Sequence, residues 1–95
     1  MFTLIYLNGK FNRPDKLLPF LQSNVGKNPT LQIDCITPFY GTKEELIRDL
    51  CKYLNSVDTQ VLVSYIVTKN VSAELSNKGN MVYFLVVEVN VSERR

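Results

Sequence analysis

Residues 80–91, NMVYFLVVEVNV, decide the fold of this chain, because they predict a strand that is apolar on both of its sides. One side presents every odd-numbered residue of the stretch, and all of these are aliphatic or aromatic. The other side presents Val82, Phe84 and Val86 before it becomes polar. A strand with two apolar sides either lies between two layers of structure or carries an interaction surface.

A second β-rich stretch, residues 59–69, precedes it, with Val61 and Val63 on one side and Leu62 and Ile66 on the other. The two stretches predict an antiparallel hairpin. The residues between them, 70–80 (NVSAELSNKGN), are polar, so we expect a long loop with room for one short helical turn.

The first part of the chain predicts strands at residues 2–7 and 30–37, with an irregular helix within 14–24 between them. Pro19 complicates that helix, because a proline inside a helix removes a backbone donor and clashes with the preceding turn. Either the helix kinks at Pro19, or it begins there and follows a separate turn.

A second helix begins after Thr42, which forms a capping box with Glu45: each side chain satisfies a backbone N–H that the helix leaves without a partner. The residues that follow repeat at helical spacing and predict one apolar stripe, made of Leu46, Ile47, Leu50, Cys51 and Leu54.

These elements predict a single α+β domain over residues 1–95, with βαβαββ order and a four-stranded mixed sheet. The strand order stays open; 30–37, 2–7, 59–69 and 80–91, or close to it, is the order that would place the two helices on opposite faces of the sheet. Two arrangements of the helices remain open. They cover opposite faces of the sheet, or, as we favour, both cover one face and leave the other for a partner.

The composition and net charge narrow the classes of function to consider. A net charge of +2, with basic residues scattered along the chain, is too balanced to indicate nucleic-acid or membrane binding. Two cysteines make no disulfide framework, and no signal sequence or membrane span is visible, so we expect a cytoplasmic protein. Ala73 is the only alanine, a bias typical of AT-rich coding sequences such as those of phages and plasmids.

Catalytic chemistry has few candidates. There is no histidine, and we expect Cys35 and Cys51 to be buried thiols rather than nucleophiles. Asp34 lies within a predicted strand, where a solvent-facing edge position explains it better than catalysis. A small enzyme that uses Cys35 or Asp34 is therefore the weakest of the functional hypotheses, and no cofactor or metal site is predicted.

The leading hypothesis is a non-enzymatic module that binds another protein or itself, as a homodimer, through a face or edge of the sheet. A small inhibitor or regulator of a host system, such as an anti-defence protein of a phage or mobile element, fits this description. The candidate contact residues are Phe39, Tyr40 and an apolar set on the uncovered face: Ile5, Leu7, Leu62, Ile66, Val82, Phe84 and Val86. The alternative is a nucleic-acid-binding regulator that stacks bases on Tyr65, Tyr83 and Phe84.

Overall fold

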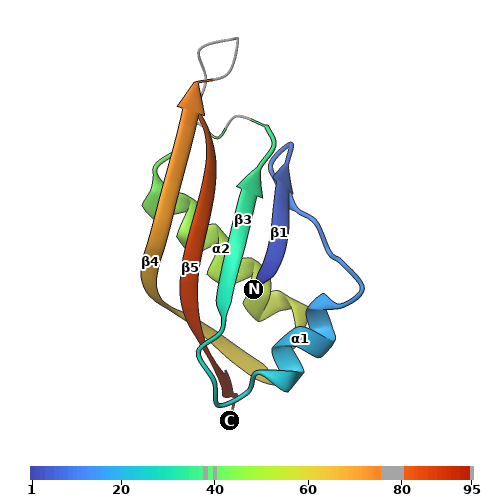
Figure 1. The fold of residues 1–95 in the computed structure, drawn as a ribbon. Helices are drawn as coiled ribbons and strands as arrows, with labels where there is room; N and C mark the ends of the chain where they lie inside the picture. The colour runs from blue at the N-terminus through green and yellow to red at the C-terminus, as the bar shows by residue number, and fades with distance from the viewer. Residues whose placement is uncertain (38, 40, 76–80, 95) are drawn as a thin grey trace.

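The protein is an α+β domain of two helices and a five-stranded mixed sheet (Figure 1). The computed structural model describes residues 1–37, 39, 41–75 and 81–94. Its elements are β1 (Phe2–Leu7), β2 (Lys10–Phe11), α1 (Leu17–Ser23), β3 (Thr30–Cys35), α2 (Lys43–Val57), β4 (Val61–Leu75) and β5 (Met81–Glu93).

The strand order is β2-β1-β3-β5-β4, with β1 parallel to β3 and the other neighbours antiparallel. The order considered from the sequence was wrong in that β3 lies between β1 and β5, whereas β4 forms an edge. Asp34 suggested an edge position for β3. Asp34 and Gln32 lie on a sheet face that neither helix covers, so they reach water from a central strand.

The fifth strand, β2, is a short return of the chain after β1. Asn8 and Gly9 both have positive φ, 52° and 84°, as the two central residues of a type I′ hairpin turn require. The turn pairs Tyr6 with Phe11 in the antiparallel register. An Asn-Gly pair is a strong short-range hairpin signal, and here it adds a strand that the prediction treated only as a turn.

Helix α1 begins at Leu17, which resolves the difficulty with Pro19. Proline is then the third helical residue, within the first turn, where a backbone N–H has no intrahelical acceptor. A separate turn precedes the helix, closed by a 3.0 Å hydrogen bond from the N–H of Leu17 to the carbonyl of Pro14.

Helix α2 begins as predicted at the capping box. The N–H of Glu45 donates to Oγ1 of Thr42 at 3.2 Å, and the N–H of Thr42 donates to Oε1 of Glu45 at 3.4 Å. The apolar stripe faces the core at Leu46, Ile47, Leu50 and Leu54, whereas Cys51 at its margin is half-buried.

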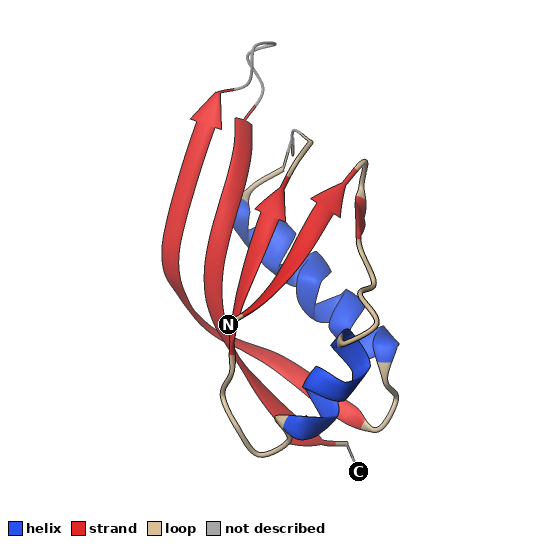
Figure 2. Cartoon of the chain, turned by 45° about the vertical axis from the view of Figure 1, so that its right-hand side comes forward, coloured by secondary structure: helices blue, strands red, loops and turns tan. Residues whose placement is uncertain are grey.

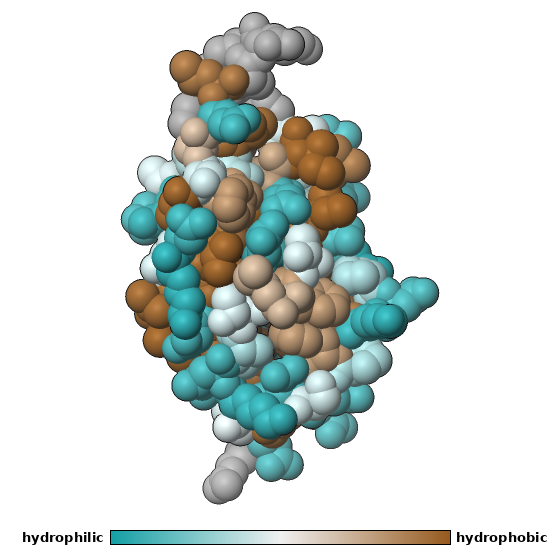
Figure 3. Space-filling view, viewed as in Figure 1, coloured by the Kyte–Doolittle hydropathy of each residue, from teal (hydrophilic) through white to brown (hydrophobic). Residues whose placement is uncertain are grey.

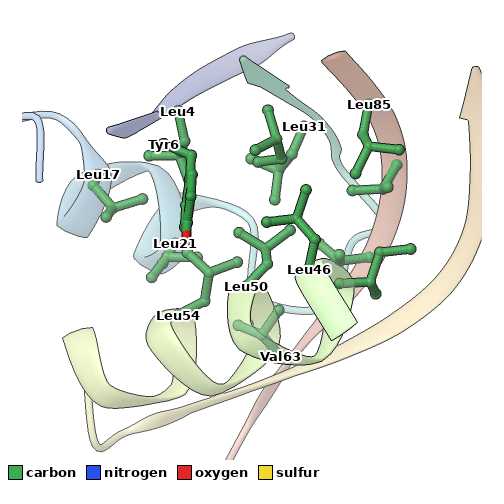
Figure 4. Close-up of a cluster of buried hydrophobic side chains, with 14 of the residues drawn as sticks. Leu4, Tyr6, Leu17, Leu21, Leu31, Leu46, Leu50, Leu54, Val63 and Leu85 are labelled. Carbon is green, nitrogen blue, oxygen red and sulfur yellow. The ribbon is translucent and has the colours of Figure 1, made fainter. Parts of the chain in front are cut away.

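Both helices cover the same face of the sheet (Figure 2), so one arrangement of the two that the sequence left open is observed. On this side, α1 and α2 contribute leucines that meet the inward residues of β1, β3, β4 and β5 (Figure 4). The fully buried large side chains are Leu4, Leu17, Leu21, Leu31, Ile33, Leu46, Leu50, Leu54, Leu85, Val87, Val89 and Val91.

The hairpin of β4 and β5 is longer than predicted and extends beyond the other strands (Figure 1). Residues 70–75, which were expected to belong to a loop, continue β4 and pair with the start of β5. The polar side chains that alternate along them, Asn70, Ser72 and Glu74, suit a strand at the sheet edge, and the β-rich partner strand outweighs the weak local preference of the segment. β3 ends its pairing with β5 at Asp34 and Phe84, so the end of the hairpin is a two-stranded ribbon.

Candidate functional site

Exposed apolar side chains concentrate on the edge strand β4. In the part of the chain that the structure describes, ten large hydrophobic residues are exposed, and six of them belong to this one strand. We call these six the β4 patch: Leu62, Tyr65, Ile66, Val67, Val71 and Leu75. An edge strand that combines unpaired backbone groups with exposed apolar side chains favours pairing with another chain.

The sheet face opposite the helices is more polar than predicted. Of the predicted apolar set, Leu7, Leu62 and Ile66 are exposed. The other members are only partly exposed: Ile5, Val82, Phe84 and Val86.

The strand order explains why that set does not form one surface. β3 lies between β1 and β5, and its Gln32 donates a 2.9 Å hydrogen bond to Asp34 on this face. The polar pair separates the apolar residues of β1 from those of β5. Lys69 of β4 and Glu88 of β5 add an ion pair at 3.1 Å. In the space-filling view, polar and apolar residues are accordingly interspersed across the face (Figure 3).

The first half of the β4 edge is covered by α2. The side-chain amide of Asn55 takes the place of a neighbouring strand: its Nδ2 donates to the carbonyl of Val63 at 3.0 Å, and its Oδ1 accepts from the N–H of Val63 at 2.7 Å. Arg94 also donates to this Oδ1, at 3.2 Å. Cys51, one helical turn before Asn55, meets the backbone of Tyr65. Covering an edge with a helix is a common protection against unwanted strand pairing.

We expect the Asn55→Ala substitution to lower the free energy of unfolding by about 1–2 kcal/mol, because it leaves both backbone groups of Val63 without their partners. Urea denaturation followed by circular dichroism measures the change. Ser56→Ala is the matched control, since Ser56 is exposed on the same helix and its hydroxyl donates to the carbonyl of Tyr53, within that helix. Equal stability of the two variants would show that Asn55 does not hold the edge.

Among the described residues, none covers the second half of the β4 edge in this way. Backbone groups of antiparallel strands point alternately to the two sides of a strand. The N–H groups of Val89 and Val91 donate toward the β3 side, to Pro29 and Lys27, so the even-numbered residues of β5 face β4. Their partners near the hairpin end are Asn70, Ser72 and Glu74.

Three residues alternate with these partners along β4: Val71, Ala73 and Leu75. Their N–H and C=O groups therefore point away from the sheet. Register irregularities between Tyr65 and Val67 and between Thr68 and Asn70 separate this free segment from the covered one. We call residues 71–75 the free edge.

Phe39 lies at the margin of the core. Its ring makes edge contacts with Tyr6, at a centroid distance of 5.5 Å, and with Tyr83, at 6.4 Å. This packing helps to close the core beneath the corner between β3 and α2, and it leaves Phe39 outside the β4 patch. Tyr40, the other aromatic residue proposed there, lies outside the described residues.

The three aromatics proposed for base stacking do not share a surface. Tyr83 packs against Phe39 on the helix-covered side, whereas Phe84 lies on the opposite face. Tyr65 is exposed at the edge, where its hydroxyl group is 2.8 Å from that of Thr68. Stacking on successive bases needs a common platform, and these positions do not provide one.

The two thiols are placed for packing. Cys35 is 6% exposed, and burial raises its pKa to about 11, against a smaller opposing effect of hydrogen bonding with the backbone of Tyr83. Burial also raises the pKa of Cys51. A raised pKa disfavours the thiolate that nucleophilic attack requires. Asp34 accepts its hydrogen bond from Gln32, and the described residues contain no cluster of three potential metal ligands.

A groove of about 500 Å³ lies between the β1–β2 hairpin and α2. Its wall includes Phe11 and Tyr53, whose rings stack at a centroid distance of 5.5 Å, and the hydroxyl of Tyr53 donates to the carbonyl of Asn12 at 2.9 Å. Charges of both signs surround it, from Lys10, Asp49 and Lys52, and they select no single class of ligand. The sequence prediction missed this groove because it missed β2.

No family model matches this chain, and neither a curated protein nor a solved structure is significantly similar to it. Neither helix among the described residues combines the length and the apolar character needed to cross a membrane. The case for function therefore rests on the geometry of β4.

Proposed function

We propose that this protein is a non-enzymatic binding module that recognises another polypeptide through the free edge of β4. The observation that carries the proposal is the division of this edge: Asn55 of α2 bonds to the backbone of Val63, and none of the described residues covers 71–75 in this way. Strand addition at such an edge gains affinity from backbone hydrogen bonds and specificity from alternate side chains.

The side chains next to the free edge support this mode of binding. Val71 is 41% exposed and Leu75 is 70% exposed, so a strand that pairs here also removes apolar surface from water. The protruding ribbon of β4 and β5 leaves room for a partner at this end of the sheet (Figure 1).

In biological terms, we infer a small cytoplasmic inhibitor or regulator of a host system, of the kind that phages and mobile elements carry. Support comes from the small size, the AT-rich coding bias seen in the single alanine, and the packing role of both thiols. Anti-defence activity is the example that we would test first, with infection or plasmid-transfer assays in cells that express the protein.

A retention experiment tests the binding site. Immobilised wild-type protein should retain either a host protein or soluble copies of itself, whereas the Ala73→Pro variant should not, because proline removes the outward N–H of the edge. Ala73→Val keeps this N–H and is the control. Retention that proline leaves unchanged would contradict the proposal, as would binding of single-stranded RNA or DNA that weakens steeply with salt in place of protein binding.

A further inference from the structure

We propose that the free edge of β4 pairs with the same edge of a second copy, antiparallel and with the two-fold axis at Ala73. This inference rests on the proposed function and names its first partner, the chain itself. The result is a continuous sheet of ten strands, because each copy contributes the five-stranded sheet described above. Two-fold pairing uses the same surface on both copies and closes on itself.

The backbone favours this pairing. In each copy, Val71, Ala73 and Leu75 direct their N–H and C=O groups outward, while Ser72 and Glu74 bond to β5. With Ala73 opposite Ala73, Val71 of each copy lies opposite Leu75 of the other. In this register, each residue whose backbone groups point outward lies opposite another such residue. The outward N–H and C=O groups of both copies can then form the hydrogen bonds of one antiparallel ladder.

Neighbouring registers are less favourable. A centre at Glu74 would place two carboxylates directly opposite each other, and like charges in that position destabilise a sheet. A centre at Val71 would place Ala73 of each copy opposite Lys69 of the other, in the irregular part of the strand between Thr68 and Asn70. The register at Ala73 avoids both conflicts.

The side chains complement one another in this register. On the helix side of the sheet, Val71 meets Leu75 of the second copy, and both are exposed in the single chain. On the opposite side, Ser72 meets Glu74, a hydroxyl donor beside a carboxylate acceptor. The smallest side chain of the segment, Ala73, lies at the axis. Lys69 forms an ion pair with Glu88 of its own sheet.

Cysteine cross-linking tests the register. Residues directly opposite in a hydrogen-bonded antiparallel pair have Cα atoms about 5.5 Å apart, within reach of a disulfide, whereas diagonal neighbours are about 7–8 Å apart. Under mild oxidation, Ala73→Cys should give a covalent dimer, and Ser72→Cys should give at least tenfold less. Both variants carry Cys51→Ser to remove the half-buried native thiol. Equal cross-linking of the two, or none in either, would overturn the register.

Sedimentation equilibrium tests the association itself. The wild-type chain and Ala73→Val should reach twice the monomer mass of 10.9 kDa with increasing concentration, and folded Ala73→Pro should remain a monomer. A wild-type monomer at high concentration overturns the inference. The proposed function survives that result only if the chain still retains a different protein in a proline-sensitive way. A dimer that Ala73→Pro leaves intact contradicts both.

Discussion

The Leu50→Ala variant is expected to lose about 2–5 kcal/mol of unfolding free energy. Leu50 is 1% exposed on the inner face of α2, where it meets the leucines of α1 and the inward residues of the sheet (Figure 4). Truncation removes three buried carbon atoms and leaves a cavity that the surrounding side chains fill only in part. A domain of this size has about 5–15 kcal/mol in total, so much of its stability depends on this contact.

Urea denaturation, at one protein concentration for all variants, measures the loss as a lower transition midpoint with an unchanged slope. Leu62→Ala is the control: it makes the same chemical change at an exposed position of β4 and should cost at most about 0.5 kcal/mol. Similar losses in the two variants would mean that α2 does not pack on the sheet as described.

Raising the pH from about 9 to 11 is expected to remove about 2–3 kcal/mol of stability through Cys35 alone. Burial raises the pKa of this thiol from 9.0 to about 11 in the folded chain. The unfolded chain therefore releases the proton at lower pH. This contribution is fully present below the unfolded pKa and is lost as the pH rises through the folded value.

Burial also raises the pKa values of Tyr6, Tyr53 and Cys51, so the comparison must isolate Cys35. The difference in unfolding free energy between the wild type and Cys35→Ala serves this purpose, because the other groups contribute to both proteins. That difference should shrink by about 2–3 kcal/mol between pH 8.5 and 11. A constant difference across this range would show that the thiol titrates normally and is not buried.

Local signals in the sequence predicted local structure well. Thr42 and Glu45 are three residues apart and interact within one helical turn, so their capping box needs no tertiary information. Pro19 restricted where α1 could begin for the same reason. Asn8-Gly9 carried an equally local hairpin signal, and β2 was missed only because its two residues are too few to show a periodic pattern.

The strand order could not be predicted in the same way. β5 is apolar on both sides and suits several central positions, and its pairing with β3 joins residues fifty or more positions apart. Asp34 indicated an edge strand because a polar residue within a strand must reach water. The sequence did not show that one whole face of the sheet is open to water, and Asp34 lies on that face. Residues 70–75 have weak strand preference of their own, and their strand forms because β5 lies beside them.

The candidate site depended on those non-local features. The sequence predicts several of its residues, including Leu62 and Ile66, as contact residues because they fall on one apolar side of a strand. The division of the β4 edge was not visible, since it arises where Asn55 of α2 reaches Val63. An asparagine within the predicted helix gave no sign that it would take the place of a strand.

Amide hydrogen exchange of β4, measured residue by residue in a dilute sample, tests whether the edge is covered at Val63 and free at residues 71–75. We expect slow exchange at Val63 and Ser72, whose N–H groups are bonded, and fast exchange at Val71, Ala73 and Leu75. The fast amides should become protected at concentrations where the chain self-associates. Exchange at Val71 and Ala73 as slow as at Ser72 in the dilute monomer would show that residues 71–75 are not a free edge.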